Sequence, residues 1–259
     1  MVRYSSVHLG MKTHHEAPTG LVPFPYTLKV SPRAKSARLK ITPHGGLVVV
    51  VPPGFDKKKI ASLLLHHEDW IKKVTAKFDA HRPAPAPLSD NGLPATIAFP
   101  DFEESWSVAY TQTKIGEVEM VERPGNRLLV SGDVANTALS CKLLCSWLKH
   151  QAQVHLLPAL EKLATAHDFS YDAAGIRLQH SRWGSCSSRR SITLNSKLLF
   201  LPEHLVRYIM VHELCHTVHL NHSATFWLLV QQHDPLWRSN NAEMKSAWKY
   251  VPQWVSAQR

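Results

Sequence analysis

The chain has 259 residues, of which 44% are hydrophobic and 19% are charged, so it can bury a core as one large domain or two small ones. This composition excludes a collagen-like, low-complexity or wholly disordered protein. Lysine and arginine number 30 against 20 acidic residues, and the resulting formal charge of +10 favours contact with polyanions or acidic proteins. No apolar run is long enough to span a membrane, and Met1–His15 lacks the apolar segment of a secretory signal. We therefore expect a soluble, cytoplasmic protein that does not contact membranes.

Residues 1–80 predict a strand-rich region followed by a helix. Two β-branched runs, at 38–42 and 47–51, flank His44-Gly45-Gly46, a pattern typical of a β-hairpin. From Asp56, which can cap a helix, apolar residues recur at helical spacing as far as Phe78. We interpret this apolar stripe as core and not as a binding face.

The middle of the chain shows no chemical motif. Residues 81–95 are rich in proline at alternating positions, which predicts a linker or a long loop. Short alternating segments within residues 96–135 predict a small antiparallel sheet. Asn136 then begins a long helical pattern to about His167, in which Pro158 should kink or divide the helix.

The last segment, residues 136–259, carries the chemistry. Two strands are predicted at Ile176–His180 and Ser191–Asn195, with a loop between them that contains Arg182-Trp183-Gly184-Ser185-Cys186. Pro202 opens a helix that should run to about Leu220. A second helix should begin near Ser223 and end at Asp234-Pro235.

Within the Pro202 helix, His212-Glu213-Leu214-Cys215-His216 matches the pattern H-E-x-x-H, which places two imidazoles one turn apart where both can bind one ion. The chain has 17 histidines, so the pattern can also arise by chance. Apolar residues on the other sides of this helix predict that it is buried. Burying two imidazoles and a carboxyl group is costly without partners, and a divalent cation offsets that cost. Hydrogen bonds to backbone carbonyls could satisfy one of the histidines, but not the whole set.

A catalytic zinc site needs a third protein ligand, for which His219 and His222 compete. His219 lies too far along an unbroken helix from His212 to bind the same ion easily. His222 suits better, because Asn221 can adopt a left-handed backbone conformation that ends the helix and turns the chain back. We therefore predict that zinc is held by His212, His216 and His222, with its fourth position left for water.

Glu213 projects away from the two histidines of its helix but can reach the outer side of a bound water. We expect it to act as general base: the ion lowers the pKa of the water, Glu213 takes the proton, and the resulting hydroxide attacks a carbonyl. Glu213 then delivers the proton to the leaving amine. The reaction predicted is hydrolysis of a peptide bond by a zinc metallopeptidase acting on a protein or peptide, with endopeptidase and exopeptidase action both open.

The same region resembles the YgjP-like metallopeptidase family, a group of SprT-like or gluzincin-type zinc proteins. The resemblance rests on four blocks in the family's order: Arg182–Ser187, Ile192–Asn195, His212–His216, and Asn221-His222-Ser223 followed by Phe226-Trp227. It covers about Gly175–Trp237 specifically. It implies a cytoplasmic α+β protein with a zincin-like C-terminal domain, in which the HExxH helix lies beside a small β-sheet. It also implies zinc at His212, His216 and His222, with Glu213 as the catalyst.

Two features depart from the family pattern: the longer, proline-rich segment from His81 to about Asn136, and the additional imidazole of His219. The Arg182–Cys186 loop has two compatible interpretations. It could line the substrate cleft, or Trp183 could anchor it in the core while Gly184 permits a tight turn.

The group that stabilises the oxyanion is left open among Arg182, His180 and Tyr208. Cys186 and Cys215 are expected to be packed thiols. The rival hypothesis for function is a non-catalytic, zinc-stabilised module that binds nucleic acid or a protein partner through the basic surface. The oligomeric state is not predicted.

Overall fold

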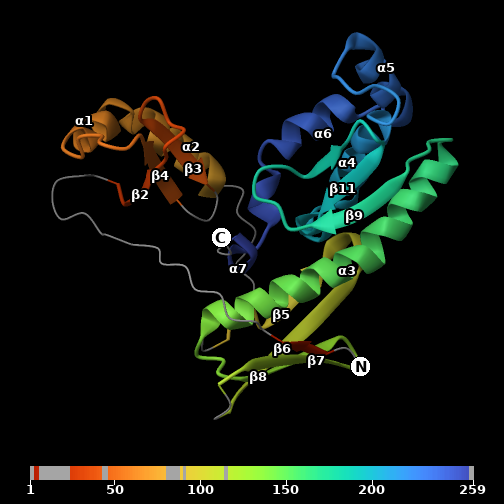
Figure 1. The fold of residues 1–259 in the computed structure, drawn as a ribbon, viewed down its shortest axis with the longest axis horizontal. Coiled ribbons are helices and arrows are strands. Elements are labelled where there is room, and N and C mark those ends of the chain that lie inside the picture. Colours follow the sequence, from red (N-terminus) through yellow and green to blue (C-terminus); the bar gives the residue numbers. More distant parts are fainter. Residues whose placement is uncertain are drawn as a thin grey trace. The chain divides into compact units, whose positions relative to one another are not determined.

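The computed structural model describes residues 3–5, 24–42, 46–79, 88–89, 92–113 and 116–256 (Figure 1). The chain forms two compact units. Unit 1 consists of Met1–Val7 together with Pro85–Arg259, and unit 2 consists of His8–Ala84. Each unit has its own cluster of buried apolar residues.

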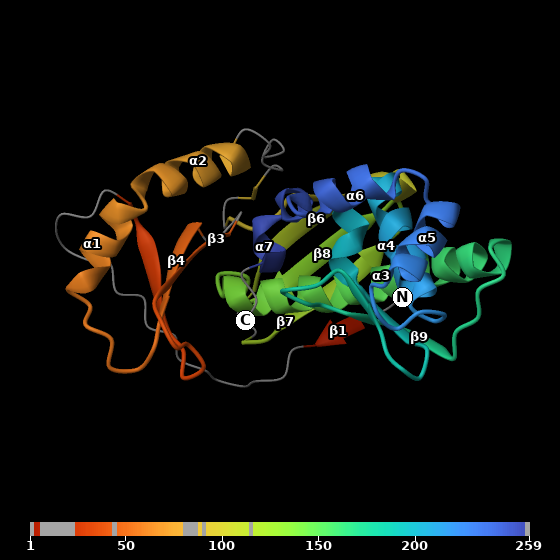
Figure 2. The same ribbon diagram turned by 90° about the horizontal axis from the view of Figure 1, so that it is seen from above.

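Unit 2 is a three-stranded sheet covered by two helices (Figure 2). The strands lie in the order β2-β4-β3, with β2 parallel to β4 and β3 antiparallel to it, so the predicted hairpin is confirmed. Its turn at 43–45 lies outside the described residues. The single helix expected after Asp56 is divided at His67. The elements are β2 (Tyr26–Val30), β3 (Arg38–Thr42), β4 (Gly46–Val51), α1 (Lys59–His66) and α2 (Glu68–Asp79).

The larger sheet of unit 1 is mixed, with strand order β1-β7-β8-β6-β5. Its strands are β1 (Arg3–Ser5), β5 (Thr96–Phe99), β6 (Glu104–Gln112), β7 (Val118–Arg123) and β8 (Arg127–Gly132). The prediction of a purely antiparallel sheet at 96–135 is wrong for the central pair, because β6 runs parallel to β8. The reason is that β7 pairs with β1 on one side and with β8 on the other, so β6 pairs with the remaining edge of β8. Because β6 runs opposite to β7, it is parallel to β8.

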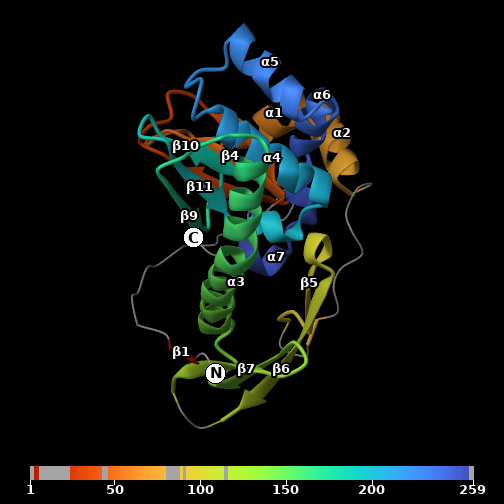
Figure 3. The same cartoon turned by 90° about the vertical axis from the view of Figure 1, so that its right-hand side faces the viewer.

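Helix α3 (Thr137–Ala166) joins this sheet to the rest of unit 1 (Figure 3). The helix begins where the pattern starting at Asn136 predicted, and the Asn136 side chain caps it by accepting a hydrogen bond from the Leu139 amide at 3.3 Å. Pro158 lies inside the helix and does not divide it. Because α3 contacts both β7 and β9, the sheet of residues 96–132 and the elements after Asn136 share one core. Composition predicted a boundary at residue 135, whereas the compact unit continues across it.

A second, smaller sheet of unit 1 has the order β10-β11-β9, with β11 parallel to β9 and antiparallel to β10. The segment predicted as a loop at 182–186 therefore contains an edge strand. The elements of this region are β9 (Ala173–Arg177), β10 (Gly184–Cys186), β11 (Ser191–Asn195), α4 (Glu203–Cys215), α5 (Ala224–His233), α6 (Trp237–Met244) and α7 (Gln253–Ser256). The described part of unit 1 also contains three 3-10 helices: η1 (Pro100–Phe102), η2 (Ser196–Phe200) and η3 (Ala247–Tyr250).

The expected α+β class is confirmed, since helices and two separate sheets make up the described part of unit 1. None of the described helices is both long and apolar enough to cross a bilayer.

Candidate metal centre

Helix α4 is buried on most of its circumference, as its apolar residues predicted. Leu205, Val211, Leu214 and Cys215 are each fully enclosed, and α4 packs against β10, α5 and α6. Packing on several sides holds the helix rigidly in unit 1. The position of the side chains that it presents is therefore fixed by the core and not by a surface loop.

The helix ends at Cys215, five residues earlier than predicted, and Asn221 does not adopt the left-handed conformation expected of it. The hydroxyl of Thr217 donates to the Leu214 carbonyl at 2.7 Å, and the His219 amide donates to the Cys215 carbonyl at 2.9 Å. These bonds form a tight turn in place of further helix. The early turn is what brings His222 back towards α4.

Three imidazoles meet at this turn. The Nε2 atom of His222 lies 3.1 Å from Nε2 of His212 and 3.2 Å from Nε2 of His216. Among the described residues, these three form the group of side chains that could hold a metal ion. His219 contributes its backbone carbonyl to the site, not its ring. The structure thus brings together the three histidines chosen from the sequence.

The protonation of these rings suits a cation. Nδ1 of His216 lies 2.9 Å from the His219 carbonyl, which can only accept, so Nδ1 carries the proton and Nε2 of the neutral ring offers a lone pair. Burial, followed by the nearby His216 and His222 rings, lowers the pKa of His212 to about 3, and burial lowers the pKa of His216. Neutral imidazole is the form that binds metal.

Hydrogen bonding alone does not satisfy this cluster. One proton on Nε2 of His222 can point at His212 or at His216, but not at both, so one lone pair stays unfilled. A tetrahedral ion with ligand distances of 2.0–2.1 Å would place its nitrogen ligands about 3.3 Å apart. The observed separations of 3.1 and 3.2 Å are close to that value. The donor set therefore fits a zinc-like ion.

Aromatic rings from α5 hold the imidazoles in place. The Phe226 ring stacks on His216 with 4.4 Å between ring centroids, and Trp227 stacks on His222 at 5.5 Å. The Ser223 hydroxyl accepts from the Phe226 amide at 3.3 Å and caps α5, as predicted. The cap fixes the first turn of α5, so it also fixes the two rings that pack on the histidines.

Glu213 lies beside the histidines in a nearly closed environment. Its side chain is 5% exposed, and its Oε2 atom has no hydrogen-bond partner among the described residues. Burial raises the pKa of Glu213 to about 8, and the positive charge of Arg182 opposes part of this rise. A carboxyl group with such a pKa can exchange a proton near neutral pH.

Gly184 has a role that the sequence analysis missed. It lies in strand β10 with an ordinary backbone conformation, so it does not serve the tight turn expected of it. A Cβ atom at this position would lie 2.6 Å from Oε1 of Glu213 and 2.7 Å from its Cγ. Only glycine therefore lets the Glu213 carboxyl group lie against β10. The glycine in the Arg182–Cys186 block was the available signal, but its purpose depends on a contact distant in sequence.

The loop before β10 is anchored in the core by Trp183, as one of the two interpretations of the Arg182–Cys186 loop predicted. Trp183 is buried and stacks on Trp248 with 4.0 Å between the ring centroids. The side-chain amide of Asn195 donates to the backbone carbonyls of Arg182, at 2.7 Å, and Gln179, at 3.0 Å. These contacts hold the Arg182 backbone beside the site.

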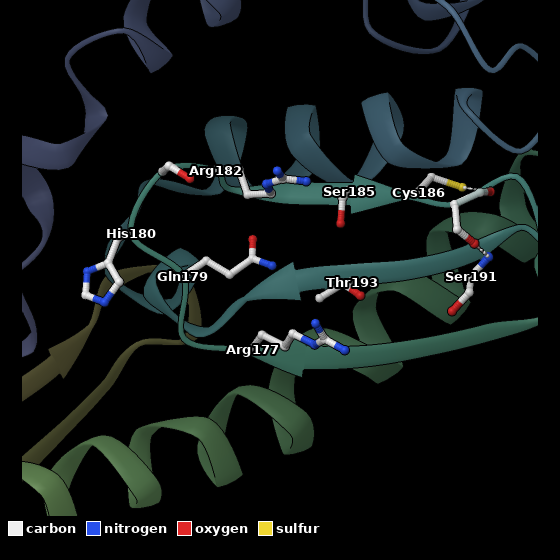
Figure 4. Close-up of a pocket in the computed structure, with 10 residues that line it drawn as sticks. Arg177, Gln179, His180, Arg182, Ser185, Cys186, Ser191 and Thr193 are labelled. Atoms are coloured by element: carbon white, nitrogen blue, oxygen red, sulfur yellow. Dashed lines mark hydrogen bonds between the residues drawn. The ribbon is translucent and has the colours of Figure 1, made fainter. Parts of the chain in front are cut away.

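The sequence analysis also considered two candidates for stabilising the oxyanion, Tyr208 and His180, and two cysteines, Cys186 and Cys215. Tyr208 is buried, and its ring meets that of His212 edge-on at 5.9 Å. His180 is exposed and lies on the loop that joins β9 to β10 (Figure 4). Burial raises the pKa of Cys215 to about 12 and that of Cys186 to about 11, so both are thiols at neutral pH. Neither cysteine offers the thiolate that a metal prefers.

Residues 35–247 match the protein family described as YgjP-like, metallopeptidase domain. The chain belongs to the YgjP-like metallopeptidase domain family. No curated protein matches it significantly. Among solved structures, the crystal structure of the metallopeptidase zymogen of Pyrococcus abyssi abylysin is similar to part of the chain, with 24% identity and a TM-score of 0.33. That match covers 35% of this chain and 92% of the other.

The match to the YgjP-like family begins in unit 2 and ends in unit 1, so the family assignment is not confined to the histidine-bearing segment. Membership supports metallopeptidase function in general and implies a divalent metal ion. The cluster of His212, His216 and His222 at the end of α4 is the group of described residues that suits such an ion.

Proposed function

We propose that this YgjP-like chain is a zinc-dependent peptidase in which His212, His216 and His222 hold the ion and Glu213 transfers the proton. The observation that carries the proposal is the convergence of three imidazoles beside a buried carboxyl group: Nε2 of His222 lies 3.1 Å from Nε2 of His212 and 3.2 Å from Nε2 of His216. Zinc bound at such a site would supply Lewis acidity, which polarises a carbonyl group and lowers the pKa of water.

The protein's own contribution to the chemistry centres on Glu213. Its Oε2 atom has no partner among the described residues, which supports a role in accepting a proton from the attacking water. Because burial keeps its pKa near neutrality, the same carboxyl group can hold that proton and release it to the leaving amine. Contact with Gly184 fixes the carboxyl group against β10 during both transfers.

Strand β10 supports a peptide as the substrate. It is an edge strand, and no strand in the described ranges pairs with its outer side. An extended peptide can add to such an edge through backbone hydrogen bonds, which recognise peptide chains of many sequences. Gly184 connects this edge to the catalytic carboxyl group, so a peptide paired with β10 would lie beside Glu213.

The proposal is tested with purified full-length protein and a set of fluorogenic peptides. We expect about one zinc per chain in metal analysis, and for Glu213→Gln a loss of about 10²- to 10⁴-fold in kcat/KM with the zinc retained. Hydrolysis by Glu213→Gln at the wild-type rate would contradict the role given to this residue.

The ligand set is tested by a matched pair of substitutions in the same turn. His222→Ala should lose zinc affinity strongly, whereas His219→Ala should retain it, because only the carbonyl of His219 contacts the cluster. Titration of the metal-free protein with zinc and a chromophoric chelator measures both affinities. Loss of zinc from His219→Ala alone would show that the assignment of the third ligand is wrong.

A further inference from the structure

The small sheet of unit 1 carries an open hollow of about 750 Å³ on its polar face (Figure 4). Thr193 of β11 lies in this hollow, between the buried residues Ile192 and Leu194 that face the core. Ser185 of β10, which pairs with Thr193, lines the hollow as well. The hollow is therefore formed by the side chains that point away from the core.

Its lining is basic and rich in hydroxyl groups. The basic groups are supplied by Arg177 at the end of β9, Arg182 before β10, and His180. No aspartate or glutamate is among the residues that line the hollow. Arg177 is exposed, and its side chain makes no ion pair or hydrogen bond with any residue in the part of the chain that is described. An unpaired guanidinium in a hollow of this size is a donor suited to a carboxylate.

Within β10 the hollow and Glu213 lie on opposite faces, whereas Arg182, which precedes the strand, lines the hollow and also acts on Glu213 through its charge. Gly184 faces Glu213, whereas its neighbour Ser185 faces the hollow, because successive residues of a strand point to opposite sides. A peptide that pairs with the outer edge of β10 follows the same alternation. If one of its residues faces Glu213, the side chains of the adjacent residues face the hollow.

We infer that the hollow is a subsite for an acidic side chain, an aspartate or glutamate, of a peptide bound along β10. This inference rests on the proposed peptidase function and adds a substrate preference to it. A peptide is favoured over single-stranded nucleic acid because none of the residues lining the hollow is aromatic, and binding of unpaired bases relies on aromatic stacking. Arg182, next to β10, would bind the carboxylate directly, with Ser185 and Thr193 as neutral hydrogen-bonding partners, whereas Arg177 on β9, the far strand of the sheet, would attract it through its positive charge.

The test compares peptides that differ only by Glu or Gln at one position, scanned through three residues on each side of the cleaved bond. The wild-type chain should cleave the Glu peptide about tenfold faster in kcat/KM at one position, with no preference at the positions directly beside it. Arg177→Gln should reduce that preference to about twofold or less. Arg177→Glu should reverse it, so that a Lys peptide is preferred at the same position.

The matched control is Arg189→Gln, which removes an equal charge from an exposed arginine of the neighbouring loop that does not line the hollow. It should retain the full preference. An equal loss of preference in Arg189→Gln and Arg177→Gln would show that the net charge of the chain, and not the hollow, selects the substrate, which would overturn the inference.

A binding measurement separates this inference from the proposed function. Fluorescence anisotropy of labelled Glu and Gln peptides reports recognition without hydrolysis. Cleavage of peptides with no Glu preference at any position overturns the subsite and leaves the peptidase intact. A second outcome is that the wild-type chain binds the Glu peptide more tightly, Arg177→Gln abolishes this difference, and no peptide is cleaved. That outcome supports the acidic subsite and rejects the peptidase. A third outcome is that the chain binds both peptides equally and binds a single-stranded oligonucleotide tightly, with Arg177→Gln weakening the binding of the oligonucleotide. That outcome overturns the acidic-peptide subsite.

Discussion

At the scale of single residues, the contact between Gly184 and Glu213 shows how closely the small sheet constrains helix α4. The carboxyl group occupies the space that any side chain at position 184 would need. This contact lies on the side of β10 that faces α4, and it involves the carboxyl oxygen Oε1 directly. The orientation of Glu213 therefore depends on a residue that has no functional group.

We predict that Gly184→Ala lowers kcat/KM by about 10- to 100-fold, because its methyl group displaces the Glu213 carboxyl group. Zinc content should stay at the wild-type level, since the histidines are not touched. Gly175→Ala is the matched control: it lies in β9 of the same sheet, and its Cβ atom would meet nothing within 4 Å. Equal activity of both variants would show that the contact does not orient Glu213.

Lys197, in η2, is a buried basic residue. It is only 2% exposed, and its Nζ atom lies 5.3 Å from the centroid of the Trp248 ring. Burial lowers the pKa of its ammonium group from the usual 10.5, and the interaction with the nearby Cys145 side chain opposes this shift in part. Because the unfolded chain binds this proton more tightly than the folded chain, the group costs stability at neutral pH, and the cost decreases as the pH rises.

We therefore expect Lys197→Met to unfold at a higher urea concentration than wild type at about pH 7, with the difference shrinking as the pH approaches 10.5. Lys149→Met, on the exposed face of α3, should change the midpoint little at either pH. A Lys197→Met protein less stable than wild type at neutral pH would show that the contact with Trp248 outweighs the cost of burial.

Much of the site could be predicted from single residues because its determinants are local. The spacing of His212 and His216 is set by one turn of helix, and Ser223 caps the helix directly after His222. The purpose of Gly184 could not be predicted, because it depends on how closely β10 approaches α4. The hollow beside β10 could not be predicted either, since Arg177 and Ser185 meet only when three strands pair.

At the scale of elements, helix α3 connects the two sheets of unit 1, and a carboxylate on β7 fixes its position. Glu122 accepts hydrogen bonds from Trp147 Nε1 at 2.7 Å and from Gln151 Nε2 at 3.1 Å. Both donors belong to buried residues of α3. Without the carboxylate, two polar groups would be left unpaired in the core.

Glu122→Ala should lower the free energy of unfolding by about 2–4 kcal/mol, because it leaves both donors without a partner. Glu119→Ala, on the same strand but exposed, should lower it by less than about 0.5 kcal/mol. Chemical denaturation followed by tryptophan fluorescence measures both changes. A similar small effect of the two substitutions would mean that water replaces the Glu122 carboxylate at no cost.

The sequence patterns did not predict the features that depend on contacts between separate segments of the chain, such as the pairing of one strand with another. Strand β10 reads Gly-Ser-Cys, which has no strand propensity of its own, and it becomes a strand only through its bonds to β11. The parallel pairing of β6 with β8 depends on which edge the β7–β8 hairpin leaves open. Helix α4 stops at Cys215 because the Thr217 hydroxyl competes for a helix carbonyl. By contrast, α3 and α5 each begin at a residue whose side chain caps the helix, and both helices were predicted.

At the scale of the whole molecule, the two units have cores made of different residues. The proline-rich composition that begins at residue 81 predicted a boundary between two regions of the chain there, and the compact units divide at Ala84. It did not show that the sheet of residues 96–132 joins the following helices, because no pattern in the sequence indicates which surface of α3 will cover which strand.

Separate cores predict separate unfolding transitions. Leu64 is fully buried in unit 2, so Leu64→Ala should cost about 2–5 kcal/mol and lower the midpoint of one transition only. Glu122→Ala should lower the midpoint of the other. Differential scanning calorimetry of both variants distinguishes the two transitions. If Leu64→Ala shifted every transition equally, the units would unfold as one cooperative body.

Strand β1 precedes unit 2 in the chain, whereas its partner β7 follows it. During translation, Arg3–Ser5 must therefore wait until the whole of unit 2 and β5 to β7 have emerged before they can pair. Unit 2 can complete its own core in that interval. Connectivity alone thus sets an order in which the smaller core forms during synthesis and the larger sheet gains its outermost strand afterwards.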